Sequence, residues 1–201
     1  MRKRILVGVI VVVLVVGLAA FLAIGANRGA GTENGLHIAG MLHVNVNVSD
    51  FDRSRAFYER LGFTVLMKVE EQATKAVASA VAMDSYRVRG ALMAHKDGSV
   101  IDLLEWRAPQ DARPPYGKLN HLGIARIALT TTDIEADVAR LKAEGVEFLS
   151  DAPAEVRDPI GGTTRFICFK DPDGTVLELV EMGTVMGLVQ RASEVVTKSA
   201  Y

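Results

Sequence analysis

The sequence predicts an α+β fold in which two tandem βαβββ modules follow an N-terminal transmembrane helix. Three observations support this fold class. Residues 5–26 form an apolar run without any charge. A strand-to-helix pattern occurs twice, at the 83-residue offset between His43 and Arg126, and an Asp-Gly turn before an apolar strand occurs twice, at the 76-residue offset between Asp97 and Asp173. Recurrence at a fixed offset indicates a repeated structural unit.

The apolar run is long enough to cross a bilayer. About 20 such residues, at about 1.5 Å each, span a hydrocarbon core of roughly 30 Å. Arg2, Lys3 and Arg4 precede the run, so the positive-inside rule predicts a cytoplasmic N-terminus and an extracytoplasmic globular part. A secretory signal cleaved before Asn27 is the alternative, but the apolar core of such signals is usually shorter. We expect an uncleaved single-pass anchor.

Composition narrows the function classes. The 201 residues are 49% apolar and 23% charged, which an apolar run and one ordinary globular domain account for. A formal net charge of −1 gives no sign of a nucleic-acid partner. The single cysteine, Cys168, excludes an intrachain disulfide, and its apolar neighbours predict a buried core residue.

These patterns divide the chain into an anchor, a tether, a two-module body and a tail that we expect to be helical. Their predicted boundaries are 1–26 for the anchor, 27–40 for the tether, 41–182 for the body and 183–201 for the tail. Within the body, module one covers 41–107, a proline-containing linker covers 108–119 and module two covers 120–182.

The start of each module reads as a half-buried strand that runs into a helix. Residues 43–50 and 126–133 alternate between apolar and polar side chains, as such strands do. Ser49 and Thr132 each stand three residues before an acidic residue, a pattern typical of a helix N-terminus. Each helix is expected to stop at a glycine, Gly62 or Gly145, with a strand following.

The end of each module reads as a β-hairpin. Residues 97–105 and 173–181 begin with Asp-Gly turns and continue as apolar strands, and the preceding strands are expected at 87–94 and 164–170. Between these elements the modules differ, because 71–83 predicts a short helix or loop where module two has 151–162.

This repeated architecture resembles the vicinal-oxygen-chelate superfamily of glyoxalases and bleomycin-resistance proteins. The motifs that carry the resemblance are VSDFDRSRAFYERLGF at 48–63 and DPDGTVLELVE at 171–181. The resemblance covers roughly 41–182 and implies a curved sheet around a cleft. Members of this superfamily include glyoxalase, methylmalonyl-CoA epimerase, extradiol dioxygenases, fosfomycin-resistance enzymes and metal-free bleomycin-binding proteins, so the fold constrains function weakly.

In metal-dependent relatives the ligands come from the first and last strands of each module. By this resemblance the four positions are His43, Asp102, Arg126 and Glu178. Arginine has no lone pair for a metal, so only three candidate ligands remain, with Glu178 also the candidate catalytic base. One imidazole and two carboxylates suit Fe, Mn, Zn or Ni without distinguishing them. His121 is a weaker alternative ligand, because on a continuous strand it faces the other side from Arg126.

A polar stripe accompanies these positions. Asn45 and Asn47 share a strand face with His43, while the intervening valines are expected in the core. Trp106 is expected in the core, with closure of the cleft edge as the alternative. Two other carboxylates, Glu105 and Glu181, are expected to be solvated at the rim.

Three functions remain open from the sequence. The first is a metal-dependent lyase or isomerase of glyoxalase or epimerase type, or a dioxygenase relative, in which the metal chelates two substrate oxygens. The second is a metal-free protein of bleomycin-resistance type, in which Arg126 binds an anionic small molecule beside Asn45 and Asn47. The third is a degenerate module in which Arg126, Asp102 and Glu178 form an internal ion cluster. A homodimer is compatible with each of them.

Overall fold

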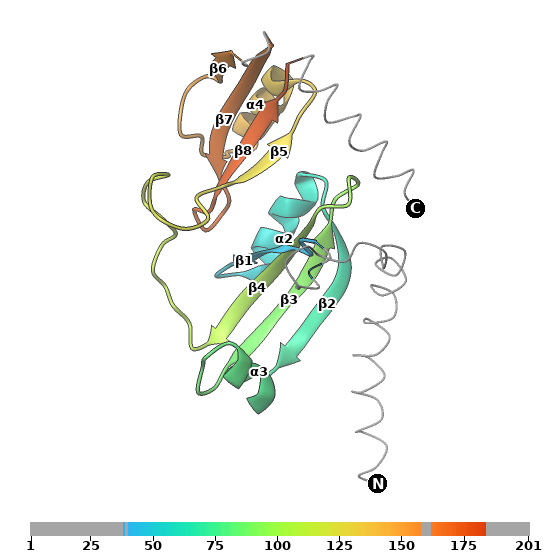
Figure 1. The fold of residues 1–201 in the computed structure, drawn as a ribbon, viewed down its shortest axis with the longest axis vertical. Helices are drawn as coiled ribbons and strands as arrows, with labels where there is room; N and C mark the ends of the chain where they lie inside the picture. Colours follow the sequence, from blue (N-terminus) through green and yellow to red (C-terminus); the bar gives the residue numbers. More distant parts are fainter. Residues whose placement is uncertain (1–37, 39, 158–161, 184–201) are drawn as a thin grey trace. The chain divides into compact units, whose positions relative to one another are not determined.

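The computed structural model describes residues 38, 40–157 and 162–183, and it confirms the α+β fold with two tandem βαβββ modules (Figure 1). The predicted anchor, most of the tether and nearly all of the tail lie outside these residues. Among the described residues no helix is long and apolar enough to cross a bilayer. The elements of module one are β1 (Val44–Asn47), α2 (Phe51–Arg60), β2 (Thr64–Gln72), α3 (Lys75–Ala80), β3 (Arg87–Ala94) and β4 (Val100–Ala108), and those of module two are β5 (Ile127–Thr130), α4 (Ile134–Ala143), β6 (Ala154–Arg157), β7 (Thr163–Lys170) and β8 (Val176–Glu181).

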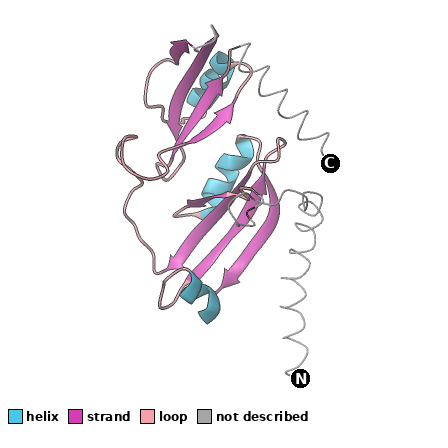
Figure 2. Cartoon of the chain, in the orientation of Figure 1, coloured by secondary structure: helices cyan, strands magenta, loops and turns pink. Residues whose placement is uncertain are grey.

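Each module forms its own four-stranded sheet with the same topology (Figure 2). The strand order is β1-β4-β3-β2 in module one and β5-β8-β7-β6 in module two. The first strand pairs with the last in parallel, and the other pairs are antiparallel. A parallel pair needs a crossover connection, which the first helix of each module begins. The pairing of Asn45 with Asp102 and of Ala128 with Glu178 places the predicted site positions on neighbouring strands.

The two helices begin one residue later than the sequence pattern predicts. The N-cap residues are Asp50 and Asp133, whose Oδ1 atoms accept hydrogen bonds from backbone N–H groups three residues on, at 3.1 and 3.0 Å. Asp and Ser are both good N-caps, so the motif did not distinguish the aspartates from the preceding hydroxyls. The predicted ends are confirmed, because Gly62 and Gly145 have positive φ angles of 96° and 81°.

The middle of each module is where the two differ most. In module one the segment predicted as a helix or loop contains α3, which is capped by Thr74. In module two the strand expected near Val146 is reduced to an isolated bridge between Phe148 and Phe169, and a short strand, β6, follows instead.

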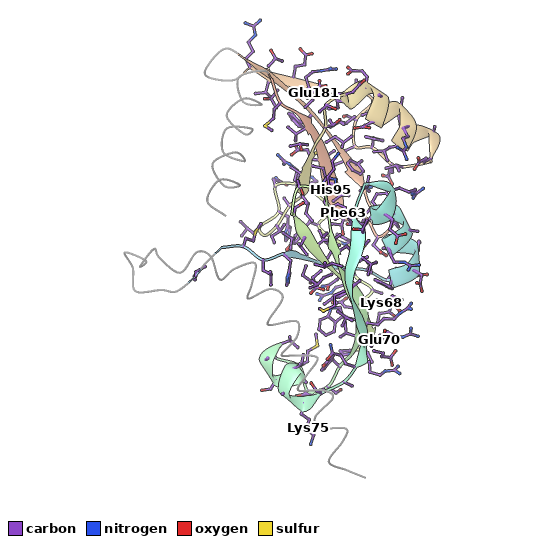
Figure 3. The ribbon with its side chains drawn as sticks, turned by 90° about the vertical axis from the view of Figure 1, so that its right-hand side faces the viewer. Phe63, Lys68, Glu70, Lys75, His95 and Glu181 are labelled. Atoms are coloured by element: carbon purple, nitrogen blue, oxygen red, sulfur yellow. The ribbon has the colours of Figure 1, made fainter. Side chains whose placement is uncertain are left out.

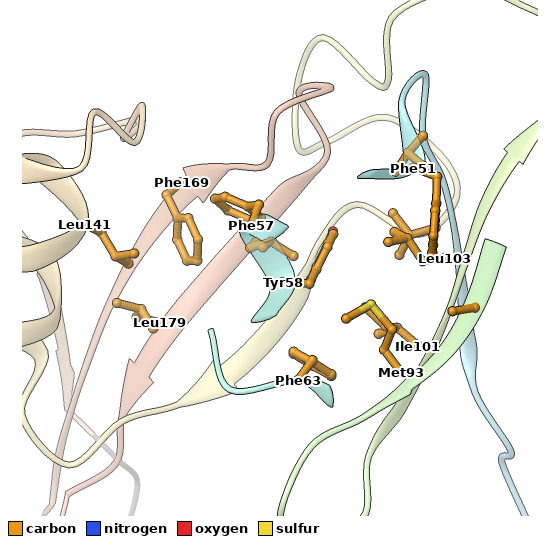
Figure 4. Close-up of a cluster of buried hydrophobic side chains, with 14 of the residues drawn as sticks. Phe51, Phe57, Tyr58, Phe63, Met93, Ile101, Leu103, Leu141, Phe169 and Leu179 are labelled. Atoms are coloured by element: carbon orange, nitrogen blue, oxygen red, sulfur yellow. The ribbon is translucent and has the colours of Figure 1, made fainter. Parts of the chain in front are cut away.

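The core lies between the helices and the helix-facing sides of the sheets. On β1 the predicted alternation is confirmed, since Val46 and Val48 are buried and the asparagines are exposed. One apolar cluster includes residues of both modules, and the rings of Phe57 on α2 and Phe169 on β7 lie 6.5 Å apart (Figure 4). The two modules therefore share part of their core.

Gly90 on β3 marks a close approach between strands. A Cβ atom at this position would lie 2.0 Å from the backbone oxygen of Leu103 and 2.8 Å from Cδ2 of Leu104. Only glycine fits there without a shift of the backbone. The equivalent position of module two, 76 residues later, is Phe166.

Candidate functional site

His43 and Asp102 form a pair in module one. Their Nε2 and Oδ2 atoms lie 3.8 Å apart, and the side chains are 32% and 18% exposed. Both the Nδ1 atom of His43 and the Oδ1 atom of Asp102 are buried without a hydrogen-bond partner. Burial raises the pKa of Asp102, and the charge of His43 acts in the opposite direction. The pair therefore presents two unsatisfied polar atoms on the face of the sheet opposite the helix.

Arg126 and Glu178 form the equivalent pair in module two. The Nε atom of Arg126 lies 3.0 Å from Oε2 of Glu178, whose side chain is 8% exposed, while that of Arg126 is 41% exposed. Within the described residues the guanidinium forms this ion pair but no hydrogen bond of good geometry. Cys168 is buried as predicted and lies beside Glu178, and burial together with that carboxylate raises the pKa of its thiol.

The two pairs do not come together as a metal centre. Among the described residues, no group of three or more His, Cys, Asp or Glu side chains could hold a metal ion. His43 and Asp102 supply two free donor atoms, but the carboxylate of Glu178 is paired with Arg126. Within this part of the chain the donor set therefore does not fit a protein-bound metal. The ligand set His43, Asp102 and Glu178 stays a prediction from sequence.

Asn45, Asn47 and Arg126, the residues predicted to bind a small molecule, line one pocket. Its volume is about 900 Å³. The floor is β1, one wall is the linker from Pro109 to Tyr116, and the remainder comes from 124–127 and the start of β8. The pocket thus combines the polar stripe with a fixed positive charge.

Hydrogen bonds hold the two asparagine side chains in place. Nδ2 of Asn45 donates to the backbone oxygen of Asp102 at 2.9 Å. Oδ1 of Asn47 accepts from Nε1 of Trp106 at 2.8 Å. The amide groups are therefore oriented, which leaves Oδ1 of Asn45 and Nδ2 of Asn47 for other partners.

His121 does not lie with the other candidate ligands. It is exposed, and its ring stacks on that of Tyr116 at a centroid distance of 4.8 Å. A Cβ atom at Gly123 would lie 2.4 Å from the hydroxyl oxygen of Tyr116. His121 therefore belongs to the packing of the linker beside the pocket.

The expectation that Glu105 and Glu181 are solvated is wrong. Glu105 is 8% exposed and its Oε2 atom accepts from the backbone N–H of Phe51 at 3.1 Å, at the start of α2. Glu181 accepts from the backbone N–H of Ile134 at 3.3 Å, at the start of α4. Each carboxylate satisfies a helix N-terminal donor and interacts favourably with the helix dipole.

An arginine completes each of these helix-start clusters. Arg89 donates to Glu105 at 2.8 Å and to Asp52 at 3.1 Å. Arg165 donates to Glu181 at 3.2 Å and also pairs with Glu135. The signal was present in the sequence, because the arginine and the glutamate each recur at the 76-residue offset.

A second missed feature connects the two modules beside the pocket. The Tyr58 hydroxyl on α2 donates to Oδ2 of Asp171 at 3.0 Å. Asp173, which lines the pocket, accepts from Ser49 at 2.5 Å, Arg53 at 2.6 Å and Ser54 at 3.1 Å. The turn before β8 is thereby bound to the start of α2, and we call this set of contacts the turn clamp.

The ionisation of the turn clamp follows from burial and hydrogen bonding. Burial raises the pKa of Asp171 in spite of the hydrogen bonds it accepts, and burial and the nearby aspartates raise the pKa of Tyr58. Burial acts in the same direction on Asp173, but hydrogen bonds from Ser49 and Arg53 outweigh it and lower its pKa. Asp173 therefore favours its charged form.

Comparison with known proteins agrees with this architecture. The family model for the "Glyoxalase/Bleomycin resistance protein/Dioxygenase superfamily" matches residues 40–179. A Vibrio cholerae protein named as a probable lactoylglutathione lyase is 31% identical over 146 residues, which cover 70% of this chain and 89% of that protein. The uncharacterised protein YwkD of Bacillus subtilis is 32% identical over 143 residues, which cover 69% and 94%. A solved glyoxalase family protein from Bacillus cereus has a TM-score of 0.63 at 24% identity, covering 76% of this chain and 99% of that one, which shows a shared fold.

Proposed function

Because the chain belongs to the glyoxalase/bleomycin resistance protein/dioxygenase superfamily, we propose that it binds a small anionic molecule in the pocket lined by Asn45, Asn47 and Arg126. The observation that carries this proposal is the position of Arg126. It stands where metal-dependent relatives place a ligand, and it lines the same pocket as the asparagines. A protein-bound metal is not needed for this function.

The chemistry of the three side chains supports an anionic ligand. The guanidinium of Arg126 is permanently charged and planar, and it pairs well with carboxylate or phosphate. Its ion pair with Glu178 uses Nε, so the two terminal NH₂ groups keep their hydrogen-bonding capacity. Nδ2 of Asn47 can donate to the same ligand, and Oδ1 of Asn45 can accept from a hydroxyl group on it.

The proposal is tested by ligand-dependent thermal stability of the full chain. Acetate, pyruvate and inorganic phosphate serve as probes. At ten times Kd, a ligand stabilises the folded state by about 1.4 kcal/mol, which raises Tm by roughly 3–6 °C. We expect Arg126→Gln to abolish this increase. The matched control is Arg140→Gln, because Arg140 also pairs through Nε with a carboxylate, Glu144 at 3.2 Å, but lies outside the pocket. An unchanged response in Arg126→Gln contradicts the proposal.

A metal-dependent lyase or isomerase is the second candidate. It is favoured by the unpartnered Nδ1 of His43 and Oδ1 of Asp102, and by the lactoylglutathione lyase named among the relatives. This function needs a third donor, which release of Glu178 from Arg126 or a second copy of the chain would have to provide. Metal content of the purified chain separates the two candidates. Absence of metal from the wild type and its appearance in Arg126→His would exclude the second candidate.

The membrane anchor and the homodimer stay predictions from sequence. We expect residues 5–26 to hold the N-terminus in the cytoplasm and the body on the other side of the membrane. Membrane fractionation and protease protection of the full chain test this expectation, and light scattering in detergent tests the dimer.

A further inference from the structure

The pocket has an apolar wall that binding of a simple anion does not require. Trp106 and Met83 line it from module one, and Pro114, Pro115 and Tyr116 line it from the linker. The volume of about 900 Å³ lies near the upper end of the range of roughly 300–1,000 Å³ for small-molecule pockets. A carboxylic acid of two or three carbon atoms would fill only a small part of this space.

Trp106 is held in a fixed orientation within this wall. Its Nε1 atom donates to Oδ1 of Asn47 at 2.8 Å, so the only polar group of the indole is already satisfied. Its ring meets that of Tyr86 in an edge-on contact, with centroids 6.0 Å apart. The indole is only partly buried, and what it offers to the pocket is therefore ring carbon surface.

A small satellite core supports the indole from behind. Tyr86, Ala78 and Val88 are buried together, with Met83, Leu104 and Trp106 packed against them. The hydroxyl of Tyr86 accepts from the backbone N–H of Thr74, the N-cap of α3, at 3.2 Å. The helix and the indole are thus parts of one packed unit, which favours a preformed binding surface.

Module two lacks this unit. The position equivalent to Trp106, 76 residues later, is Met182. The connection that contains α3 covers 73–86, whereas the equivalent connection in module two covers only 158–162. Module one therefore departs from the repeat at the same place where its side chains meet the pocket, which is expected if the departure serves a ligand.

We infer that the ligand carries an aromatic ring beside its anionic group, with the ring on Trp106 and the anion at Arg126. This inference rests on the proposed function and narrows it to ring-bearing carboxylates. The oriented amide of Asn47 lies between these two parts of the site, since it contacts the indole and lines the same pocket.

The test compares benzoate, acetate and benzyl alcohol as probes of the full chain, because they separate the ring from the charge. Affinities come from calorimetry, and emission provides an independent readout because Trp106 is the only tryptophan. We expect benzoate to bind roughly two- to tenfold more tightly than acetate, the range that one aromatic contact provides, and to change the emission of Trp106. Trp106→Leu should remove this preference while acetate affinity stays the same. Met83→Leu, which keeps an apolar side chain in the same wall, is the control.

The outcomes distinguish the two proposals. Equal affinities for benzoate and acetate, or benzoate binding that leaves the emission of Trp106 unchanged, overturn the aromatic subsite and leave the anion proposal standing. Equal affinities for benzoate and benzyl alcohol in both the wild type and Arg126→Gln overturn the anion proposal alone. Failure of all three probes to bind overturns both. Because the emission readout uses the wild type, poor folding of Trp106→Leu does not block the test.

Discussion

The turn at 95–99 in module one and the turn at 171–175 in module two join equivalent strands, but their acidic groups have different partners. In module one, Asp97 accepts hydrogen bonds only from its own turn, from the N–H of Ser99 at 2.9 Å and its hydroxyl at 2.6 Å. In module two, Asp171 and Asp173 reach across to α2. Equivalent positions of a repeat can thus hold one turn together or hold two modules together.

The residue that begins each turn explains the difference. In module one it is His95, whose ring packs on that of Phe63 at 5.3 Å (Figure 3). In module two it is Asp171, which is 5% exposed and accepts from Tyr58 and from the backbone N–H groups of Asp173 and Thr175. A buried carboxylate needs such donors, and α2 supplies one of them.

The largest expected effect comes from removing the buried carboxylate of the turn clamp. Asp171→Ala leaves the Tyr58 hydroxyl and two backbone N–H groups without a partner, so we expect the free energy of unfolding to fall by about 3 kcal/mol. His95→Ala, at the equivalent position, should reduce it by about 1 kcal/mol or less. Urea denaturation measures both. Equal losses would show that the two turns are energetically alike in spite of their different contacts.

The helix-start clusters should differ less. Glu105→Gln removes a charge that is 8% exposed and bound to Arg89, so we expect a loss of about 2 kcal/mol. Glu181 has a side chain that is 25% exposed, and Glu181→Gln should lose about 1 kcal/mol. Denaturation of the two variants side by side measures the ratio. A larger loss from Glu181→Gln would contradict the ranking by burial.

The smallest expected effect is a pH-dependent one at Asp173. Its pKa is lowered in the folded state, so its stabilising contribution is fully present above the unfolded pKa, about 3.9, and is lost as pH falls through the folded pKa. We expect Asp173→Asn to lose about 1 kcal/mol at neutral pH, and this difference from wild type to shrink below about pH 4. The raised pKa of Asp171 acts in the opposite direction, so the difference between variant and wild type is the quantity to measure.

The matched control for this measurement is Asp97→Asn. Hydrogen bonds from Ser99 and the charge of His95 outweigh burial and lower the pKa of Asp97 to about 2. Its side chain is 51% exposed, and solvent screening reduces its contribution. The pH profile of Asp97→Asn should therefore have the same sign and a smaller amplitude. A larger amplitude than that of Asp173→Asn would contradict the comparison.

Much of the fold was predictable because the repeat supplies two readings of each element. The strand at 87–94 and both helix-ending glycines lie where the pattern placed them. Where the modules diverge the prediction weakened, as at Val146, since strand pairing there depends on a partner that periodicity does not reveal.

The site was predictable only in part. Alternation along β1 placed Asn45 and Asn47 on the open face, because side chains of a strand alternate strictly. The same rule put Glu105 on the other face, but it could not show that a helix N-terminus and Arg89 lie there to neutralise the carboxylate. The turn clamp was missed for a related reason, since Tyr58 and Asp171 are 113 residues apart. Contacts between modules leave no trace in local periodicity.

The absent side chain at Gly90 restricts how this chain can be re-engineered. Strands β3 and β4 are so close at that point that Phe166, the counterpart in module two, could not be transplanted there. Chimeras that exchange whole strands between the halves are therefore expected to misfold even though the halves have the same topology. The two halves have become dissimilar enough that each is now an obligate complement to the other rather than a spare copy.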